Sequence, residues 1–119
     1  MAQVVFSRNA ASNLERLHRF LAEKNPDAAA RAVNVIVDRL ASLARFPLLG
    51  PVDPDRPDAR QLFIRFGAAG YVARYRVFDD TVLEDTVIVL AIRHMREAGY
   101  PEEPPKPRPR ARSSRRRRS

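Results

Sequence analysis

The amino-acid sequence predicts an α+β domain in the order β-α-α-β-β-β: an antiparallel sheet covered by a helical hairpin, with a disordered basic C-terminal tail. Three observations lead to this prediction. Apolar residues recur with helical spacing in two stretches near the N-terminus, three strand-like segments joined by turn residues follow them, and the composition changes at Pro101. We expect a folded domain over residues 1–100 and a disordered Pro/Arg-rich tail over residues 101–119.

The first expected elements are a short strand and an amphipathic helix. The apolar segment Gln3 to Phe6 suits a strand. Ser7 suits the N-cap of a helix, because its hydroxyl can accept a hydrogen bond from a backbone N–H that has no partner in the first turn. The helix should run from Arg8 to Glu23, since apolar side chains spaced by four, three and four residues would share one face: Ala10, Leu14, Leu17 and Leu21.

A second helix is predicted from Pro26 to about Arg45. Asn25 suits its N-cap, Pro26 its first helical position, and Asp27 the positive end of the helix dipole. The link between the helices is short, which predicts an antiparallel hairpin with both apolar faces against one sheet. A helix with a free apolar face for a partner is the alternative. We favour packing because the sheet that follows needs a cover.

The rest of the domain is predicted as a loop and a three-stranded antiparallel meander. Leu48 to Ala59 contains Gly50 and three prolines, and its aspartates lack the spacing of a calcium loop, so a solvated loop is expected. Strands follow at 61–66, 71–78 and 86–92, with a turn at 67–70 and a charged connection at 79–85. In the middle strand one face should carry Tyr71, Ala73, Tyr75 and Val77, and the other Val72, Arg74, Arg76 and Phe78.

The last strand, Thr86 to Ile92, is expected at the centre of the sheet and buried on both faces. Its seven residues are uncharged and five of them are β-branched. Four polar side chains follow within eight residues and could form a functional site at the strand end: Arg93, His94, Arg96 and Tyr100. The alternative is that these residues only mark where the strand leaves the core for water.

Composition limits the kinds of site that the chain can build. It has no cysteine, which excludes disulfides and thiolate metal sites, and its two histidines, His18 and His94, argue against a histidine metal site. We therefore expect no metal and no cofactor. No apolar run approaches the roughly 20 residues of a membrane span. Because the N-terminus also lacks the pattern of a signal peptide, we expect a cytoplasmic protein with no membrane partner.

Most of the net charge of +8 comes from the tail. Residues 101–119 hold eight basic and two acidic residues, whereas the first hundred hold 14 basic and 12 acidic residues. The charge balance is therefore no evidence that the folded domain binds nucleic acid. For the tail segment Lys106 to Arg118 two interpretations stay open. It is either a solvated extension or a source of salt-dependent, sequence-independent contact with nucleic acid.

Several short strings resemble, in their order, the RelE/ParE superfamily of toxins from bacterial type II toxin–antitoxin systems, and the ParE-like branch in particular. They are Val5-Phe6-Ser7 before a helix, Asn25-Pro26 between helices, Phe46-Pro47 followed by Gly50, then Arg60, Gly70-Tyr71, Tyr75-Arg76 and Ile92-Arg93-His94-x-Arg96. The resemblance covers nearly all of residues 3–100 and none of the tail. It implies a toxin that a cognate antitoxin neutralises in a heteromeric complex, with a heterotetramer as one candidate stoichiometry.

The resemblance leaves two mechanisms to compare. ParE-like members act on DNA gyrase by stabilising its cleaved complex and are not enzymes, whereas RelE-like members cut messenger RNA in the ribosome. A metal-free endoribonuclease would need a base, an acid and cations for the phosphate, and the candidates here are His94, Tyr100, Arg76 and Arg93. Three observations argue against it, the first being that the region before Arg60 offers aspartates in a proline-rich loop and not a placed glutamate. Lys24 is the only lysine before the tail, whereas RelE-like sites draw on lysines near the sheet, and His94 and Tyr100 are six residues apart rather than adjacent.

We therefore expect a non-enzymatic, ParE-like toxin that inhibits DNA gyrase by protein binding. A RelE-like, ribosome-dependent endoribonuclease is the alternative, and an inactive relative that only binds its partner is a third interpretation. The candidates for contact with antitoxin or gyrase are Arg60, Arg65, Arg74, Arg76, Arg93 and Arg96. Arg74 and Arg76 could equally be solvated positions on an exposed sheet face. His94 would then be a packing or hydrogen-bonding residue near the end of the last strand.

Overall fold

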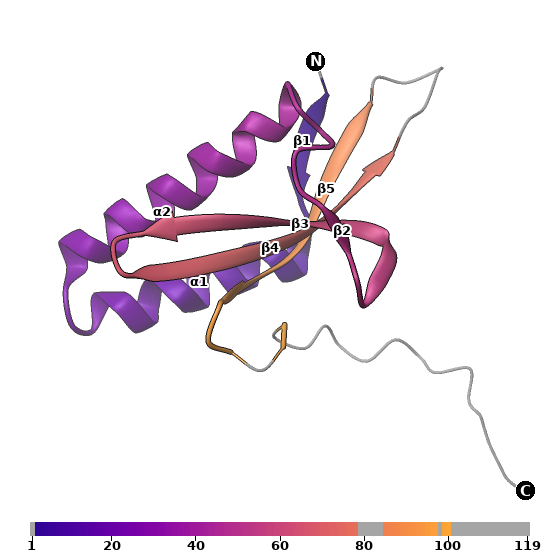
Figure 1. The fold of residues 1–119 in the computed structure, drawn as a ribbon. Helices are drawn as coiled ribbons and strands as arrows, with labels where there is room; N and C mark the ends of the chain where they lie inside the picture. The colour runs from indigo at the N-terminus through magenta and orange to yellow at the C-terminus, as the bar shows by residue number, and fades with distance from the viewer. Residues whose placement is uncertain (1, 79–84, 98, 101–119) are drawn as a thin grey trace, which may run out of the picture.

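The computed structural model describes residues 2–78, 85–97 and 99–100. Two helices lie on one side of a five-stranded sheet, and the N-terminal strand lies beside the last strand (Figure 1). The predicted α+β class is confirmed. The expected connection at 79–85 lies outside the described residues except for Asp85, and the expected tail at 101–119 lies outside them entirely.

A short strand and two helices form the N-terminal half of the fold. β1 spans Gln3–Phe6, α1 spans Arg8–Ala22 and α2 spans Pro26–Ala41. α2 gives way to a 3₁₀ turn, η1, at Ser42–Ala44, so the α-helix ends earlier than the predicted Arg45. The Ser42 hydroxyl donates to the Arg39 carbonyl at 2.5 Å. Such a local bond competes with the backbone ladder and helps to end the α-helix.

Both helices begin at the predicted N-caps. Ser7 Oγ accepts a hydrogen bond from the Ala10 N–H at 3.0 Å, and Asn25 Oδ1 accepts one from the Ala28 N–H at 3.1 Å. These bonds satisfy donors that a first helical turn leaves without a partner. Within the described ranges, no helix combines the length and the apolar character that a membrane span requires.

The sheet has the strand order β1-β5-β4-β3-β2. β2 spans Val52–Asp53, β3 Arg56–Phe66, β4 Ala69–Phe78 and β5 Thr86–His94. β1 runs parallel to β5 and the other neighbours are antiparallel, so the prediction of a fully antiparallel sheet is wrong at β1. The parallel direction brings the start of α1 to the middle of β5, where the Ser7 N–H donates to the Val89 carbonyl at 2.9 Å.

The two faces of β4 are those that its alternation predicts. Tyr71, Ala73, Tyr75 and Val77 lie in the hydrophobic core or pack against it, on the side that the helices cover. We call the opposite side of the sheet the outer face. β5 lies between β1 and β4, as an interior strand should, but its expected burial on both faces is wrong. Thr86, Ile88 and Leu90 remain partly exposed.

The predicted loop Leu48 to Ala59 contains a second hairpin. Val52–Asp53 forms β2 and pairs with the start of β3, which begins at Arg56 and not at Gln61. The prolines of this segment suggest a loop, yet a proline is compatible with a strand at its first residues or at a sheet edge. Asp53 also departs from the expected solvated loop, because it is fully buried and its Oδ1 accepts from the Asp55 N–H at 2.8 Å.

Candidate functional site

A bulge in β5 decides which side chains reach the outer face. Arg74 lies opposite Ala91 and Tyr75 lies opposite Val89, so Leu90 is an extra residue without a partner in register. Strict alternation after the buried Val89 would turn Arg93 towards the helices. The extra residue shifts the register by one, which sends Arg93 to the outer face and His94 to the helix side. This bulge therefore separates two of the predicted site residues.

The Leu90 bulge is held by the first turns of α1. The Leu90 carbonyl accepts hydrogen bonds from Ser7 Oγ at 3.1 Å and from Asn9 Nδ2 at 3.0 Å. The buried Asn13 accepts from the Ile92 N–H through Oδ1 at 2.9 Å, beyond the extra residue. Three polar side chains, one from the N-cap of α1 and two from its first turns, thus satisfy backbone groups where the strand leaves regular pairing.

His94 is a packing and hydrogen-bonding residue on the helix side. Its ring meets the buried Tyr71 ring edge-on, with 5.3 Å between the centroids. Its Nδ1 accepts from the Arg96 N–H at 3.0 Å, and its backbone N–H donates to Glu97 Oε1 at 2.8 Å. Glu97 also pairs with Arg16 of α1 at 3.1 Å. The histidine therefore helps to fix the turn that follows β5.

Tyr100 lies on the outer face with two of the predicted arginines. The guanidinium carbons of Arg74 and Arg93 lie 4.3 and 5.0 Å from the centroid of the Tyr100 ring. The Tyr100 hydroxyl donates to Gln61 Oε1 at 2.7 Å. Gln61 faces Arg74 in the register of β3 and β4, so the three side chains meet across neighbouring strands. We call Asp53, Gln61, Arg74, Arg93 and Tyr100 the Tyr100 cluster.

Asp53 stabilises this cluster through an ion pair with Arg74. Its Oδ2 accepts from Arg74 Nε at 2.6 Å, and the two side chains are 1% and 14% exposed. A buried carboxylate of this kind needs a cation and hydrogen-bond donors to compensate its lost hydration. Arg74 and the Asp55 N–H supply them. The positive charge of Arg74 is therefore already paired within the domain.

Burial raises the pKa of Tyr100 to about 12, against the opposing effect of Arg74 and Arg93. The Tyr100 phenol therefore stays neutral in the folded protein. In the unfolded protein the same phenol has a pKa of about 10, and at and below that pH its contribution to the stability of the fold is fully present. We expect the free energy of unfolding to fall as the pH rises from about 10 to 12, because only the unfolded state ionises readily there. Absorbance titration of the phenolate should show a transition near 12 that disappears in Tyr100→Phe. A Tyr100 transition near 10 in the folded protein would contradict this assignment.

The other predicted arginines do not join the Tyr100 cluster. Arg76 Nε lies 3.5 Å from Asp58, and Arg60 Nη1 donates to the Gly50 carbonyl at 2.8 Å. A hydrogen bond from Arg56 is the main reason why the pKa of Asp58 lies below its usual range. Arg65 and Arg96 are exposed. The structure thus brings together Arg74, Arg93 and Tyr100, and leaves Arg60, Arg65, Arg76, Arg96 and His94 apart from them.

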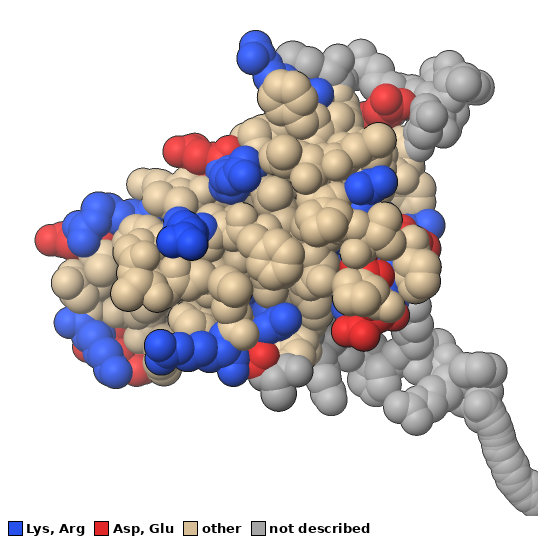
Figure 2. Space-filling model, viewed as in Figure 1, with Lys and Arg blue, Asp and Glu red and all other residues tan. Residues whose placement is uncertain are grey.

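The face drawn in Figure 2 carries no single basic patch. Basic side chains are scattered over this face and along its edge, several of them beside acidic ones, with uncharged areas between them. In the described part of the chain, no three His, Asp or Glu side chains gather as they would around a metal ion. The described surface offers arginines interleaved with apolar groups, and Phe63 and Met95 are exposed among them.

Sequence reasoning missed two members of the cluster. Asp53 lies in a segment whose prolines and acids look solvated, and nothing local indicates that its carboxylate is buried against Arg74. Gln61 stands at the predicted start of a strand, and only the register with β4 places it beneath the Tyr100 hydroxyl. Alternation within β4 does place Arg74 on the face away from the core, which was the available signal.

Comparison with known proteins agrees with the resemblance seen in the sequence. The chain matches, over residues 4–99, the family model described as the ParE toxin of the type II toxin–antitoxin system parDE. Toxin RelE3 of Caulobacter vibrioides is 36% identical over 97 residues, which cover 82% of this chain and 98% of that protein. Toxin RelE1 of the same organism is 35% identical over 79 residues, covering 66% and 83%.

A solved structure of the chromosomal ParDE TA system from P. aeruginosa shares the fold. Its TM-score is 0.64 at 23% identity, over 79% of this chain and 96% of that chain. At this level of identity the likeness concerns the fold alone, and the family rests on the sequence matches. The chain therefore belongs to the ParE toxin family of the RelE/ParE superfamily and is a toxin of a type II toxin–antitoxin system.

Proposed function

We propose that this toxin arrests growth by binding DNA gyrase, without being an enzyme, and that a cognate antitoxin neutralises it. The observation that carries the proposal is the separation of His94 from Tyr100 by the sheet. His94 packs on Tyr71 under the helices, whereas Tyr100 lies with Arg74 and Arg93 on the outer face. The two candidate acid–base groups therefore cannot act on one phosphate in this arrangement.

The Tyr100 cluster by itself is a poor match to RNA cleavage. Cleavage without a metal needs a group that takes a proton near neutral pH and unpaired positive charge at the phosphorane. The pKa of Tyr100 is raised to about 12, so this phenol stays protonated. The charge of Arg74 is paired with Asp53. The cluster instead has the features of a rigid support for the segment after β5.

Exposed apolar and basic side chains support a protein target. Phe63, Phe78 and Met95 are exposed near the arginines of the sheet, with 49%, 38% and 51% of their surfaces accessible. Aromatic residues, methionine and arginine are the types enriched in protein interfaces. This surface is able to contribute anchors to a large partner such as gyrase.

The RelE-like endoribonuclease remains the second candidate because two specific observations favour it. The curated relatives at 36% and 35% identity carry the RelE name. Tyr100 also lies beside two guanidiniums, which could contact a phosphate if the segment after β5 moved. In that case Tyr100, Arg93 and Arg76 would act on the RNA, and His94 would have to leave Tyr71.

Purified toxin should inhibit plasmid supercoiling by gyrase and accumulate cleaved plasmid, while messenger RNA on translating ribosomes stays intact. His94→Ala should retain toxicity, as should the matched control His18→Ala on the exposed side of α1, because a non-enzymatic toxin needs neither imidazole as an acid or a base. Thermal melting would verify that both variants fold. Codon-specific cuts in ribosome-bound messenger RNA, lost in folded His94→Ala or Tyr100→Phe, would establish the endoribonuclease. Normal growth on expression without antitoxin would identify an inactive relative.

A further inference from the structure

The two buried tyrosines of β4 differ in how their hydroxyls are used. The Tyr75 hydroxyl accepts a hydrogen bond from the Gly50 N–H at 2.9 Å and donates one to the Pro47 carbonyl at 2.8 Å. Tyr71 is only 1% exposed, yet its hydroxyl has no hydrogen-bond partner in the described part of the chain. Burial raises the pKa of this phenol, which therefore stays protonated near neutral pH and can donate. A buried donor without an acceptor is costly, so a ligand that accepts from it would be bound favourably.

A hollow of about 460 Å³ lies beside Tyr71, on the helix side of the sheet. Its apolar wall consists of Leu17 and Leu21 from α1 and Ala69 from β4, together with the Tyr71 ring. Its polar side chains come from α1 and from the turn that follows β5. A hollow of this size, with an apolar lining and a few polar groups, is typical of sites for small molecules.

His94 lines the same hollow and supplies a second donor. Its ring meets the Tyr71 ring edge-on, with 5.3 Å between the centroids. Because Nδ1 accepts from the Arg96 N–H at 3.0 Å, the ring proton lies on Nε2. None of the residues that the structure describes accepts from Nε2. Two neighbouring rings at the wall therefore each carry a donor that the protein itself does not use.

The charges on the wall favour a ligand with a single negative charge. Arg16 pairs with Glu97 at 3.1 Å, and Glu97 also accepts from the His94 N–H at 2.8 Å. The exposed Arg96 has no carboxylate partner among the ion pairs of the described ranges. Two guanidiniums and one carboxylate leave one positive charge uncompensated at this hollow. A monoanion would balance it.

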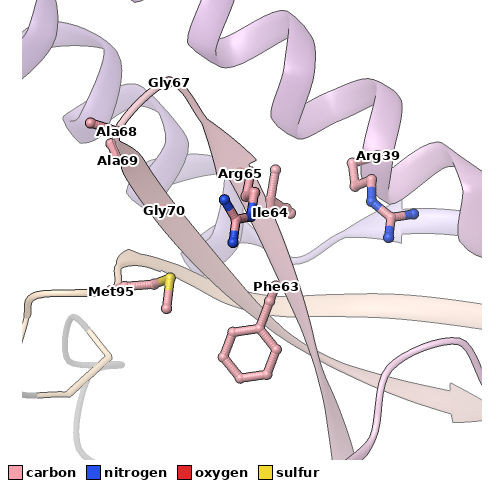
Figure 3. A pocket seen from close by; sticks show the side chains of 9 residues that line it. All are labelled: Arg39, Phe63, Ile64, Arg65, Gly67, Ala68, Ala69, Gly70 and Met95. Carbon is pink, nitrogen blue, oxygen red and sulfur yellow. The ribbon is translucent and has the colours of Figure 1, made fainter.

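A larger hollow, of about 630 Å³, lies beside the β3–β4 hairpin and lacks these features (Figure 3). Arg39, Phe63, Arg65 and Met95 line it, and all four are exposed. Ile64 is the one buried residue on its described wall, and its side chain is apolar. Water can hydrate the arginines of this larger hollow, so no buried donor there requires a ligand.

We propose that the hollow beside Tyr71 binds a small monocarboxylate with an apolar body. The Tyr71 hydroxyl and His94 Nε2–H would donate to the carboxylate oxygens, while Arg96 would supply the compensating charge. The body of the ligand would lie against the apolar wall and be removed from water there. The site lies across the sheet from the Tyr100 cluster, and the proposal does not depend on gyrase as the target.

Titration of the full-length toxin with hydrocinnamate, followed by nuclear magnetic resonance, is the direct test. The shifted signals should centre on Leu17, Tyr71 and His94. The neutral isostere hydrocinnamamide should bind at least roughly tenfold more weakly, because it lacks the charge that strengthens the hydrogen bonds. Acetate should bind more weakly still, because it has no apolar body.

Three outcomes of this titration would overturn the proposal. The first is no binding of hydrocinnamate, and the second is equal binding of hydrocinnamate and its amide. The third is binding of acetate as tight as that of hydrocinnamate. That result would assign the donors to a bare carboxylate, such as an acidic side chain of a partner protein.

Two tyrosine variants separate a binding role for Tyr71 from a structural one. Tyr71→Phe removes a hydroxyl without a protein partner, so it should melt at or above the wild-type temperature but bind hydrocinnamate roughly tenfold more weakly. Tyr75→Phe is the matched control. It loses two hydrogen bonds, so it should melt at a lower temperature and bind hydrocinnamate as tightly as the wild type. Normal binding by Tyr71→Phe, or an equal loss of binding in both variants, would contradict the proposed site.

An arginine pair tests the charge of the ligand. Arg96→Gln should reduce the preference for hydrocinnamate over its amide by severalfold, whereas Arg31→Gln should leave it unchanged. Arg31 is the matched control because it is an exposed arginine of α2 outside the hollow. An unchanged preference in Arg96→Gln would show that Arg96 does not balance the ligand's charge and would overturn that part of the assignment. These measurements use neither gyrase nor ribosomes, so their failure is distinct from failure of the proposed function.

Discussion

Replacing Asp53 by alanine should lower the free energy of unfolding by about 3 kcal/mol, although the residue lies in a strand of only two residues. The substitution leaves the guanidinium of Arg74, whose side chain is 14% exposed, without its buried carboxylate. It also removes the acceptor of the Asp55 N–H in the turn that follows. Breaking one side of a buried pair costs more than the pair contributes, because the remaining charge loses both its hydration and its partner.

Urea denaturation of matched variants would measure this effect. Asp55→Ala removes an exposed carboxylate two residues away and should change the free energy of unfolding by less than about 0.5 kcal/mol. Asp53→Asn keeps the shape and an acceptor for the turn but removes the charge, so it should fall between the two. If Asp53→Ala and Asp55→Ala were equally mild, the ion pair with Arg74 would not be the support that we infer.

The parts of the fold that the sequence predicted are those with local causes. Ser7 and Asn25 cap helices through contacts three residues away, and apolar spacing alone defines α1 and α2. The alternation of β4 likewise needs no knowledge of its neighbours, and it correctly separated Tyr75 from Arg74. Such features can be predicted from the sequence because the residues that create them are adjacent or regularly spaced along the chain.

The errors concern features that depend on distant parts of the chain. The parallel direction of β1 and the short β2 are both consequences of pairing across the sheet. The site depends even more on such pairing. An extra residue at Leu90, stabilised by side chains of α1, decides that Arg93 faces Tyr100 while His94 faces Tyr71. Six residues of separation between His94 and Tyr100 therefore carried no information on whether they share a face.

A second large loss of stability is expected for Gly50→Ala. Gly50 is buried beside the middle of the sheet, and a Cβ there would overlap the Gln61 carbonyl oxygen and lie 2.8 Å from the Gln61 carbonyl carbon. It would also lie 3.1 Å from Tyr75 Cε1. The obstacle is backbone, and it is fixed because the Gln61 N–H donates to the Pro51 carbonyl at 2.9 Å. A clash that only backbone movement can relieve should cost about 3 kcal/mol.

The backbone shift would also strain a network of hydrogen bonds that holds the segment between η1 and β2 in place. The Tyr75 hydroxyl accepts from the Gly50 N–H at 2.9 Å and donates to the Pro47 carbonyl at 2.8 Å, while Arg60 donates to the Gly50 carbonyl at 2.8 Å. These bonds tie a core tyrosine to the entry of β2. Movement of Gly50 therefore weakens several buried hydrogen bonds together, each worth about 1 kcal/mol.

Substitutions at Gly70 and Gly99 are the comparison for Gly50→Ala, because a Cβ meets different surroundings at each position. A Cβ at Gly70 would overlap the sulfur of Met95, a flexible and exposed side chain that can move aside, so Gly70→Ala should cost about 1 kcal/mol. A Cβ at Gly99 meets nothing within 4 Å, so Gly99→Ala should be close to neutral. Thermal and urea unfolding should therefore rank the losses as Gly50, Gly70, then Gly99. A Gly50→Ala protein as stable as Gly99→Ala would mean that Gly50 and Gln61 are not packed backbone to backbone.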